Sequence, residues 1–195
     1  MRRWCNRVIR LRMMETFREV TERLDRLEIP YMVTGSFAMG VYATARTTLD
    51  IDIIVEITRA DIGRFVAAFA KDFYVQDSSV LRAVEHHSMF NMISTATSLK
   101  VDCIVRKNTA VEKAKFARRT RGRIGDHEFW AISRDDLILS KLAWARESLS
   151  ERQFEDIDRL LEKNADLENI LQEVDVQDLS GVWDEFNKWK TRKKQ

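Results

Sequence analysis

Three aspartates carry the strongest chemical signal in this sequence. Asp50 and Asp52 lie two positions apart in the run DIDIIV, which is typical of a buried β-strand. Side chains alternate between the faces of a strand, so both carboxylates leave one face, about 6.6 Å apart along the backbone. Two ionised carboxylates beside aliphatic residues repel each other and are costly to remove from water. A shared divalent cation, Mg²⁺ or Mn²⁺, would offset that cost.

The third aspartate, Asp102, interrupts a second aliphatic run at residues 99–105, LKVDCIV. A lone acid in a strand that reads as central is unusual. If this strand pairs beside the one that holds Asp50 and Asp52, three carboxylates converge at one edge of the sheet. Sites of this kind hold two divalent ions roughly 3.5–4 Å apart. We therefore expect these three aspartates to be the metal-binding residues.

A phosphate site is predicted just before them. An apolar strand at residues 31–33 leads to Gly35 and Ser36, and residues 37–43 have the small and apolar side chains of a short buried helix. Glycine permits close backbone approach, and a helix N-terminus offers free N–H groups and a positive dipole end. The Ser36 hydroxyl either adds a phosphate contact or only caps the helix. Arg46 is either a solvated loop charge or a further phosphate contact.

These parts together resemble the signature of the DNA polymerase β-like nucleotidyltransferase superfamily. Gly35-Ser36 is followed by thirteen residues (37–49), then by DIDI, and later by VDC around Asp102. The run GSFAMG is similar to the minimal nucleotidyltransferases. The run RTTLDID, which begins at Arg46, is similar to AbiEii-type bacterial nucleotidyltransferases, many of which are toxins of toxin–antitoxin systems.

The helical parts of AbiEii-type proteins often carry a lysine and, further on, an aspartate. Lys141 in SRDDLILSKL and Asp156 in DIDR are similar to that pair, so the resemblance covers residues 31–161. From the sequence pattern alone, Lys141 lies in line with Leu137 and Trp144 at helical spacing. It either snorkels along an apolar face or contacts a triphosphate or a core acid. Asp156 is either solvated or part of the site.

The resemblance implies a fold, a reaction and a set of roles. The fold is α/β (α+β), with a mixed β-sheet nucleotidyltransferase core, flanking helices and a helical C-terminal part. The reaction is the Mg²⁺-dependent (or Mn²⁺-dependent) transfer of a nucleoside monophosphate from an NTP to a hydroxyl. Asp50 and Asp52 would hold metal against the triphosphate, and Asp102 would complete the second metal site and help deprotonate the acceptor. The catalytic residues would be Asp50, Asp52 and Asp102, and the nucleotide-binding residues Gly35, Ser36, Arg46 and Lys141.

The rest of the pattern places these residues on elements. We expect a first helix at 14–27, a helix after Thr58, a helix near 111–117, and further strands near 73–76, 89–94 and 128–132. From Ser133 onward the apolar spacing is helical. We therefore expect a nucleotidyltransferase core at 14–132 and a helical C-terminal region at 133–195. Residues 1–13 are interpreted as a disordered arm or an upstream extension.

The composition indicates the cellular location of the protein but does not identify the molecule that accepts the nucleotide. The net charge is only +2, the two cysteines suggest neither a disulfide framework nor a zinc site, and no apolar run approaches the roughly 20 residues that cross a bilayer. We expect a cytoplasmic protein with no membrane partner.

The arginine cluster at residues 118–123 is either solvated or grips RNA phosphate. It slightly favours RNA, especially a tRNA 3′ end, over a small molecule such as an aminoglycoside or a protein hydroxyl. A cognate antitoxin is a further possible partner. The alternative is a non-catalytic nucleotidyltransferase-like binding subunit, which would bind neither metal nor NTP.

Overall fold

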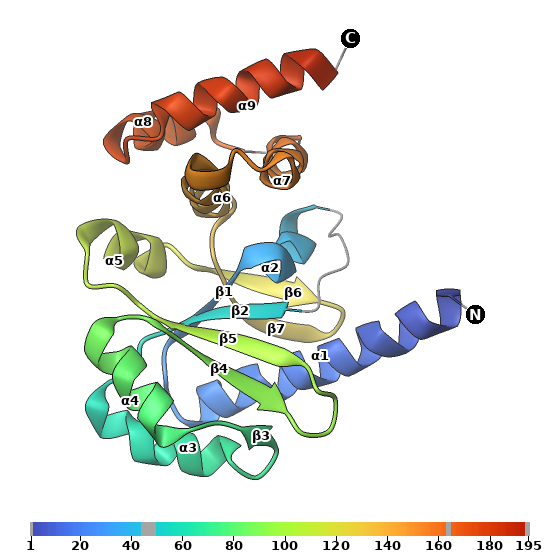
Figure 1. The fold of residues 1–195 in the computed structure, drawn as a ribbon, viewed down its shortest axis with the longest axis vertical. Helices are drawn as coiled ribbons and strands as arrows, with labels where there is room; N and C mark the ends of the chain where they lie inside the picture. Colours follow the sequence, from blue (N-terminus) through green and yellow to red (C-terminus); the bar gives the residue numbers. More distant parts are fainter. Residues whose placement is uncertain (1, 44–49, 163–164, 194–195) are drawn as a thin grey trace.

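The computed structural model describes residues 2–43, 50–162 and 165–193. They form one seven-stranded mixed sheet with helices around it, which confirms the predicted fold class (Figure 1). The strands lie in the order β3-β4-β5-β2-β1-β7-β6. Their bounds are β1 Tyr31–Thr34, β2 Asp50–Val55, β3 Phe73–Tyr74, β4 Met89–Ser94, β5 Lys100–Val105, β6 Thr120–Ile124 and β7 His127–Ala131.

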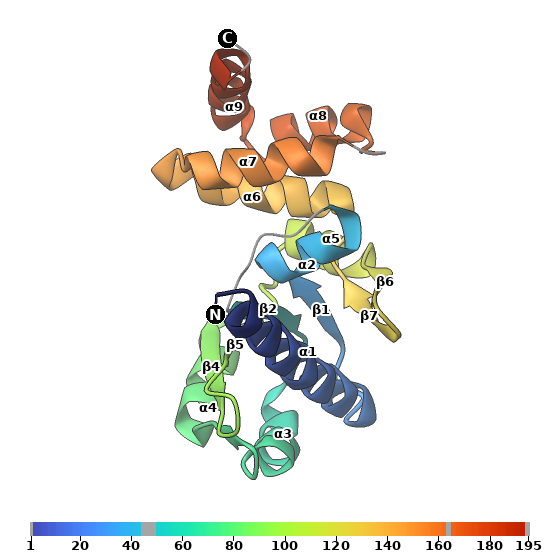
Figure 2. The same cartoon turned by 90° about the vertical axis from the view of Figure 1, so that its right-hand side faces the viewer.

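The helices gather at the two ends of the sheet and across one of its faces. Helices α6 to α9 stack at one end, and α3 and α4 lie at the other (Figures 1 and 2). Within the described residues, no helix combines the length and apolar character that crossing a bilayer requires. The helix bounds are α1 Arg2–Arg26, α2 Gly35–Tyr42, α3 Ile62–Phe69, α4 Asp77–His86, α5 Ala110–Ala117, α6 Arg134–Ser148, α7 Glu151–Leu161, α8 Leu167–Val176 and α9 Ser180–Lys193, with a 3₁₀ turn η1 at Arg59–Asp61.

The centre of the sheet is the pair of strands that carries the aspartates. Strand β2 pairs in parallel with β5 on one side and antiparallel with β1 on the other. Every residue of β1 is buried. Helix α1 packs its apolar side on this region, where the ring of Phe17 lies 4.3 Å from that of Phe37 and 4.7 Å from that of Phe129, measured between centroids. The strands are therefore fixed by a continuous core.

Three elements differ from the sequence-based expectations. Helix α1 begins at Arg2, so residues 2–13 continue the helix and are not a disordered arm, while the interpretation as an upstream extension stays a prediction. Helix α4 was not predicted, because its buried positions, Val80 and Ala83, make too short a pattern to stand out from the adjacent β-rich runs. Strand β6 was missed because its arginines obscure the alternation typical of a strand.

The C-terminal helices share a small aromatic core. Phe154 of α7 packs against Phe186 and Trp189 of α9, with ring centroids 5.8 and 5.9 Å away. Helix α6 begins with a side-chain cap, in which the Ser133 hydroxyl accepts a hydrogen bond from the backbone N–H of Asp136. The cap fixes where α6 starts above the sheet.

Candidate active site

The register of the sheet brings the aspartates together. Asp52 and Asp102 are direct partners across the parallel β2–β5 pair. Two residues earlier in the same strands, Asp50 is the partner of Lys100. Partnered residues of neighbouring strands project from the same face of a sheet. The condition set by the sequence, that the two strands be neighbours, is therefore met. Ile51 and Ile53 face the other way and are fully buried, as expected.

The aspartates lie on the floor of a cavity of about 880 Å³. Alternate residues of β2 and β5 make the floor, the turn at Gly35 and Ser36 makes one side, and helices α5, α6 and α7 make the rest. Charge is divided between these walls. The acidic residues are Asp50, Asp52, Asp102 and Glu112, and the basic residues are Lys100, Arg106, Lys107, Lys115, Lys141 and Arg152. A cavity with carboxylates below and cations around suits a metal-bound polyphosphate.

The glycine at the start of α2 is required by its contact with Asp52. Gly35 has φ +65°, and a Cβ built on it would overlap Oδ2 of Asp52 and stand 2.8 Å from its Cγ. The backbone of the β1–α2 turn therefore lies directly against the central carboxylate. Ser36 lines the cavity in the first turn of α2, while Thr34 holds the N-cap position. Ser36 is consequently not the helix cap, which leaves the phosphate contact as the remaining prediction for it.

A lysine occupies the space between two of the acids. The Lys100 ammonium lies 2.9 Å from Oδ2 of Asp102 and 3.8 Å from Oδ1 of Asp50. Its hydrogen bond to Asp102 raises the pKa of Lys100, and the negative charges around it add to the shift. Within the described ranges, no group of three His, Cys, Asp or Glu side chains is arranged to hold a metal ion. Closing the three carboxylates around a cation therefore requires Lys100 to move aside.

The carboxylates nevertheless retain the features of a cation site. Oδ1 of Asp102 is buried and has no hydrogen-bond partner among the described residues. Burial is the main cause that raises the pKa of Asp52 from 3.8 to about 6, followed by the negative charges of Asp102 and Asp50. The positive charges of Lys100 and Lys141 act in the opposite direction without cancelling the rise. An orphaned oxygen beside a carboxylate that resists ionisation fits a bound divalent cation.

Lys141 approaches the cavity from α6 and is held there by a buried acid. Its ammonium lies 2.7 Å from Oδ2 of Asp156 on α7, and the two side chains are 6% and 1% exposed. Gln153 accepts a second hydrogen bond from Lys141 at 3.3 Å. Asp156 is thus not solvated, and the acid that Lys141 contacts at this distance belongs to the helical C-terminal region. Lys141 lines the cavity and is anchored there by the buried Asp156.

The sequence-predicted residues separate into those that line the cavity and those that do not. Gly35, Ser36 and Lys141 line it with the three aspartates, whereas Arg46 falls outside the described residues. The arginine cluster is engaged elsewhere. Arg118 pairs with Asp136 at 2.7 Å, and the guanidinium groups of Arg119 and Arg121 lie over the Trp130 ring.

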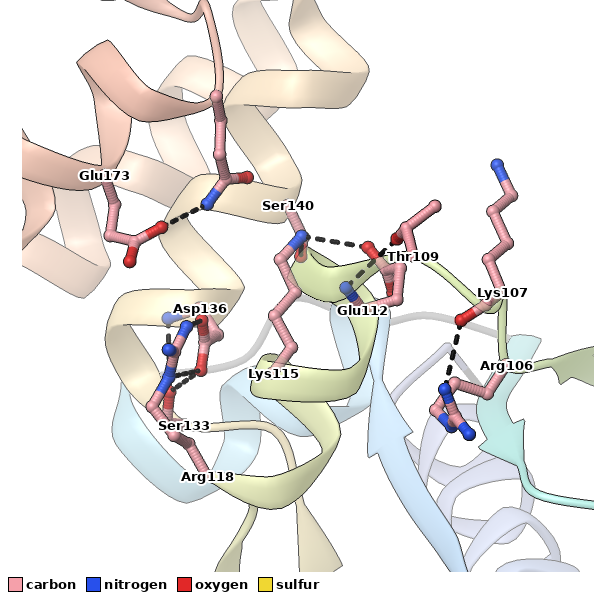
Figure 3. Close-up of polar contacts among 11 residues, drawn as sticks. Arg106, Lys107, Thr109, Glu112, Lys115, Arg118, Ser133, Asp136, Ser140 and Glu173 are labelled. Carbon is pink, nitrogen blue, oxygen red and sulfur yellow. Dashed lines mark hydrogen bonds and ion pairs between the residues drawn. The ribbon is translucent and has the colours of Figure 1, made fainter.

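Several cavity residues were not anticipated. Lys115 on α5 is buried and donates hydrogen bonds to Glu112 and Ser140, at 3.2 and 3.5 Å (Figure 3). Lys100 could have been identified, because it lies two positions before Asp102 in the same strand and must share its face. Trp144 could have been identified as well, because it shares the helical face of Lys141. No local signal marks Lys115 or Arg152, since these residues reach the cavity only through the packing of α5 and α7.

Comparisons with known proteins show the same fold. No protein-family profile matches the chain, and no curated protein sequence does. Among solved structures, the antibiotic-resistance factor ANT(2'')-Ia, in complex with adenylyl-2''-tobramycin, aligns with 92% of this chain and 99% of its own, at TM-score 0.53 and 13% identity. An antigenic nucleotidyltransferase-like protein from Paracoccidioides brasiliensis aligns over 90% and 92% of the two chains, at 0.52 and 16%. The lincosamide adenylyltransferase LnuA, bound to lincomycin, aligns over 73% and 92%, at 0.50 and 12%. The chain therefore has a nucleotidyltransferase-like fold.

The contact between Gly35 and Asp52 generates the first prediction. Gly35→Ala adds a left-handed strain of about 1–2 kcal/mol and an overlap with the carboxylate that costs about 1–3 kcal/mol more. Gly125→Ala is the matched control, because Gly125 has φ +64° and open space around its Cα. Urea unfolding is expected to show a larger loss of stability for Gly35→Ala. Equal losses for the two variants would contradict the close approach.

The raised pKa of Asp52 generates the second prediction. Between pH 3.8 and about 6 the folded state holds the Asp52 proton more tightly than the unfolded chain, so ionisation above that window destabilises the fold. In metal-free protein near pH 8, Asp52→Asn is expected to raise the unfolding free energy by on the order of 2 kcal/mol.

The gain should shrink as the pH falls through about 6, because the wild-type carboxyl regains its proton there. Urea unfolding in the presence of a chelator, at pH values on both sides of this window, measures the difference between the two proteins. A difference that is constant across the window would show that Asp52 ionises normally.

Proposed function

We propose that this protein is a Mg²⁺- or Mn²⁺-dependent nucleotidyltransferase that moves a nucleoside monophosphate from an NTP to an acceptor hydroxyl. The observation that carries the proposal is the direct pairing of Asp52 with Asp102 on the cavity floor, against the Gly35 backbone. The nucleotidyltransferase-like fold supports the same conclusion.

Each cavity residue has a part in the proposed transfer. The acceptor oxygen bonds to the α-phosphorus, the bond between the α-phosphorus and its bridging oxygen breaks, and pyrophosphate leaves. Asp102 accepts the proton of the acceptor hydroxyl. Asp50 and Asp52 would hold a divalent metal against the triphosphate, and Asp102 would also complete the second metal site. The metal, when bound, neutralises charge on the phosphate oxygens.

The nucleotide's phosphates are assigned to the walls of the cavity around the aspartates. Gly35 allows the backbone to approach closely, and the N-terminal N–H groups of α2 with the Ser36 hydroxyl supply donors. Lys141, backed by Asp156, supplies a positive charge facing Asp52. Arg46 belongs to this phosphate-binding group on sequence grounds alone.

For the acceptor we favour a phosphate-bearing molecule, with an RNA or tRNA 3′ end first. Six basic side chains line the cavity against four acidic ones. Such a lining repels a polycationic aminoglycoside and attracts a phosphodiester chain. A small-molecule acceptor is the second candidate, because the structures of LnuA and ANT(2'')-Ia contain lincomycin and adenylyl-2''-tobramycin. A protein hydroxyl ranks third.

The biological setting follows from the motif around Arg46, Asp50 and Asp52. Its likeness to AbiEii-type proteins supports a cytoplasmic toxin with a cognate antitoxin. A non-catalytic binding subunit is the competing proposal, and the Lys100 ion pairs within the acidic cluster are the observation that favours it. The enzyme proposal requires the aspartates for turnover. In the binding-subunit proposal they only destabilise the fold through mutual repulsion.

Replacing Asp50 or Asp52 on the cavity floor distinguishes the enzyme proposal from the binding-subunit proposal. Asp50→Asn or Asp52→Asn is expected to lower nucleotide transfer by at least about a hundredfold without unfolding the protein, since metal chemistry contributes several kcal/mol. Asp126→Asn is the control, because Asp126 is exposed, lies outside the cavity and pairs with Arg18. The assay follows labelled NMP into total RNA and pyrophosphate into solution, with Mg²⁺ and each NTP in turn. Transfer at the wild-type rate by both floor variants would contradict the enzyme proposal.

The buried Lys141–Asp156 pair gives a prediction that separates stability from binding. Asp156→Ala leaves a buried charge without its partner and is expected to cost about 3–5 kcal/mol in urea unfolding. The double change Lys141→Met with Asp156→Leu removes both charges and is expected to recover most of that loss. Its affinity for inorganic triphosphate with Mg²⁺ should still fall about tenfold or more. Full triphosphate affinity in the stable double variant would show that Lys141 is only structural.

A further inference from the structure

Helix α6 presents a graded row of side chains to the cavity. Leu137, Ser140, Lys141 and Trp144 recur at spacings of three and four, which places them on one face of the helix, and all four line the cavity. Leu137 is 1% exposed and Lys141 is 5% exposed, whereas Trp144 is 69% exposed. The row therefore leads from the closed interior to the rim, where it ends in an indole open to solvent.

Trp144 differs from the other tryptophans whose side chains the structure describes. Trp130 lies under two arginines, Trp183 packs against Phe186, and Trp189 contacts Phe154 and Phe186. Trp144 has no ring or cation–π contact with any described residue. A large aromatic face left open at a cavity rim is available for a flat ligand ring.

The cavity that Trp144 lines also carries exposed cationic side chains. Lys107 and Arg152 are exposed, line the same cavity, and make no ion pair within the described residues. Figure 3 shows the Lys107 side chain extending away from that of its neighbour Arg106. Arg106 itself is paired with Glu56. The rim thus combines one open aromatic face with uncommitted positive charge, which suits an aromatic base that carries phosphate.

The spacing along α6 connects this rim to the phosphate side. Trp144 lies three residues beyond Lys141, about 4.5 Å along the helix axis at 1.5 Å per residue. A phosphate near Lys141 therefore has its attached nucleoside within reach of the indole. A protein partner would also cover exposed apolar residues, but the flanking cations favour an anionic ligand.

We propose that Trp144 is a stacking platform for a nucleobase, with Lys107 and Arg152 contacting the phosphates of the same ligand. This inference rests on the proposed function, because it names a binding residue of that site. The base belongs either to the bound NTP or to the terminal nucleotide of an RNA acceptor. Both have the same chemistry, an aromatic base joined to phosphate.

The test compares ligands with and without a base. Calorimetric titration of the full chain in Mg²⁺ with ATP, and separately with inorganic triphosphate, is expected to show ATP binding about five- to a hundredfold more tightly, the range that one stacked base supports. Trp144→Ala should abolish this difference in affinity between ATP and triphosphate without changing the affinity for triphosphate. Trp144→Phe should keep most of the difference. Trp183→Phe is the control for an aromatic residue outside the cavity. ATP should quench tryptophan fluorescence in wild type and much less in Trp144→Phe.

The outcomes separate the two sources and the two proposals. In one outcome, Trp144→Ala leaves the preference for ATP over triphosphate unchanged but weakens the binding of a short single-stranded RNA about five- to a hundredfold. In that case the stacked base belongs to the RNA acceptor. If neither ligand responds to Trp144→Ala and fluorescence is unquenched, the platform proposal is wrong, although ATP binding would still support the proposed function. If the wild-type protein binds neither ATP nor triphosphate, the proposed function fails and the platform falls with it.

Discussion

The convergence of negative charge where β2 pairs with β5 is the constraint on which the rest of the site depends. Parallel register sets Asp52 directly beside Asp102, and the alternation of β2 adds Asp50 to the same face. Burial and mutual repulsion raise the pKa of Asp52 to about 6, so the cluster is unfavourable when fully ionised. Lys100 offsets part of this charge, and one buried oxygen of Asp102 has no described partner. The fold therefore holds together a cluster of negative charges that Lys100 offsets only in part.

The walls around this floor complement it. A β1–α2 turn that tolerates only glycine brings backbone against Asp52, and α6 and α7 bring the Lys141–Asp156 pair to the opposite side. The acidic floor and basic walls together match a metal-bound triphosphate, because the carboxylates would contact the metal and the basic side chains would contact the phosphate oxygens. The fold alone does not identify a reaction. The proposal of nucleotide transfer depends on this local distribution of charge.

Local patterns in the sequence were sufficient for the central part of the site. The period of two in β2, the lone acid in β5 and the glycine after β1 each reflect a physical requirement within a few residues, and the sheet register agrees with them. Longer-range features were not accessible. Lys115 and Arg152 meet at the cavity because separate helices pack together, and no spacing within one segment encodes that meeting. Trp144 is different, because it shares the helical face of Lys141. Helix α4 was missed because two buried positions make a weak periodic signal.

The most direct test is to locate the metal. Crystals grown with Mn²⁺ and a non-hydrolysable ATP analogue, measured for anomalous scattering, report where the ion lies. The account predicts a manganese peak within coordinating distance of both Asp52 and Asp102, with the Lys100 ammonium displaced and the analogue's triphosphate along the Gly35 turn. A structure with the analogue bound but no manganese between these carboxylates, or with Lys100 still seated on Asp102, would contradict it.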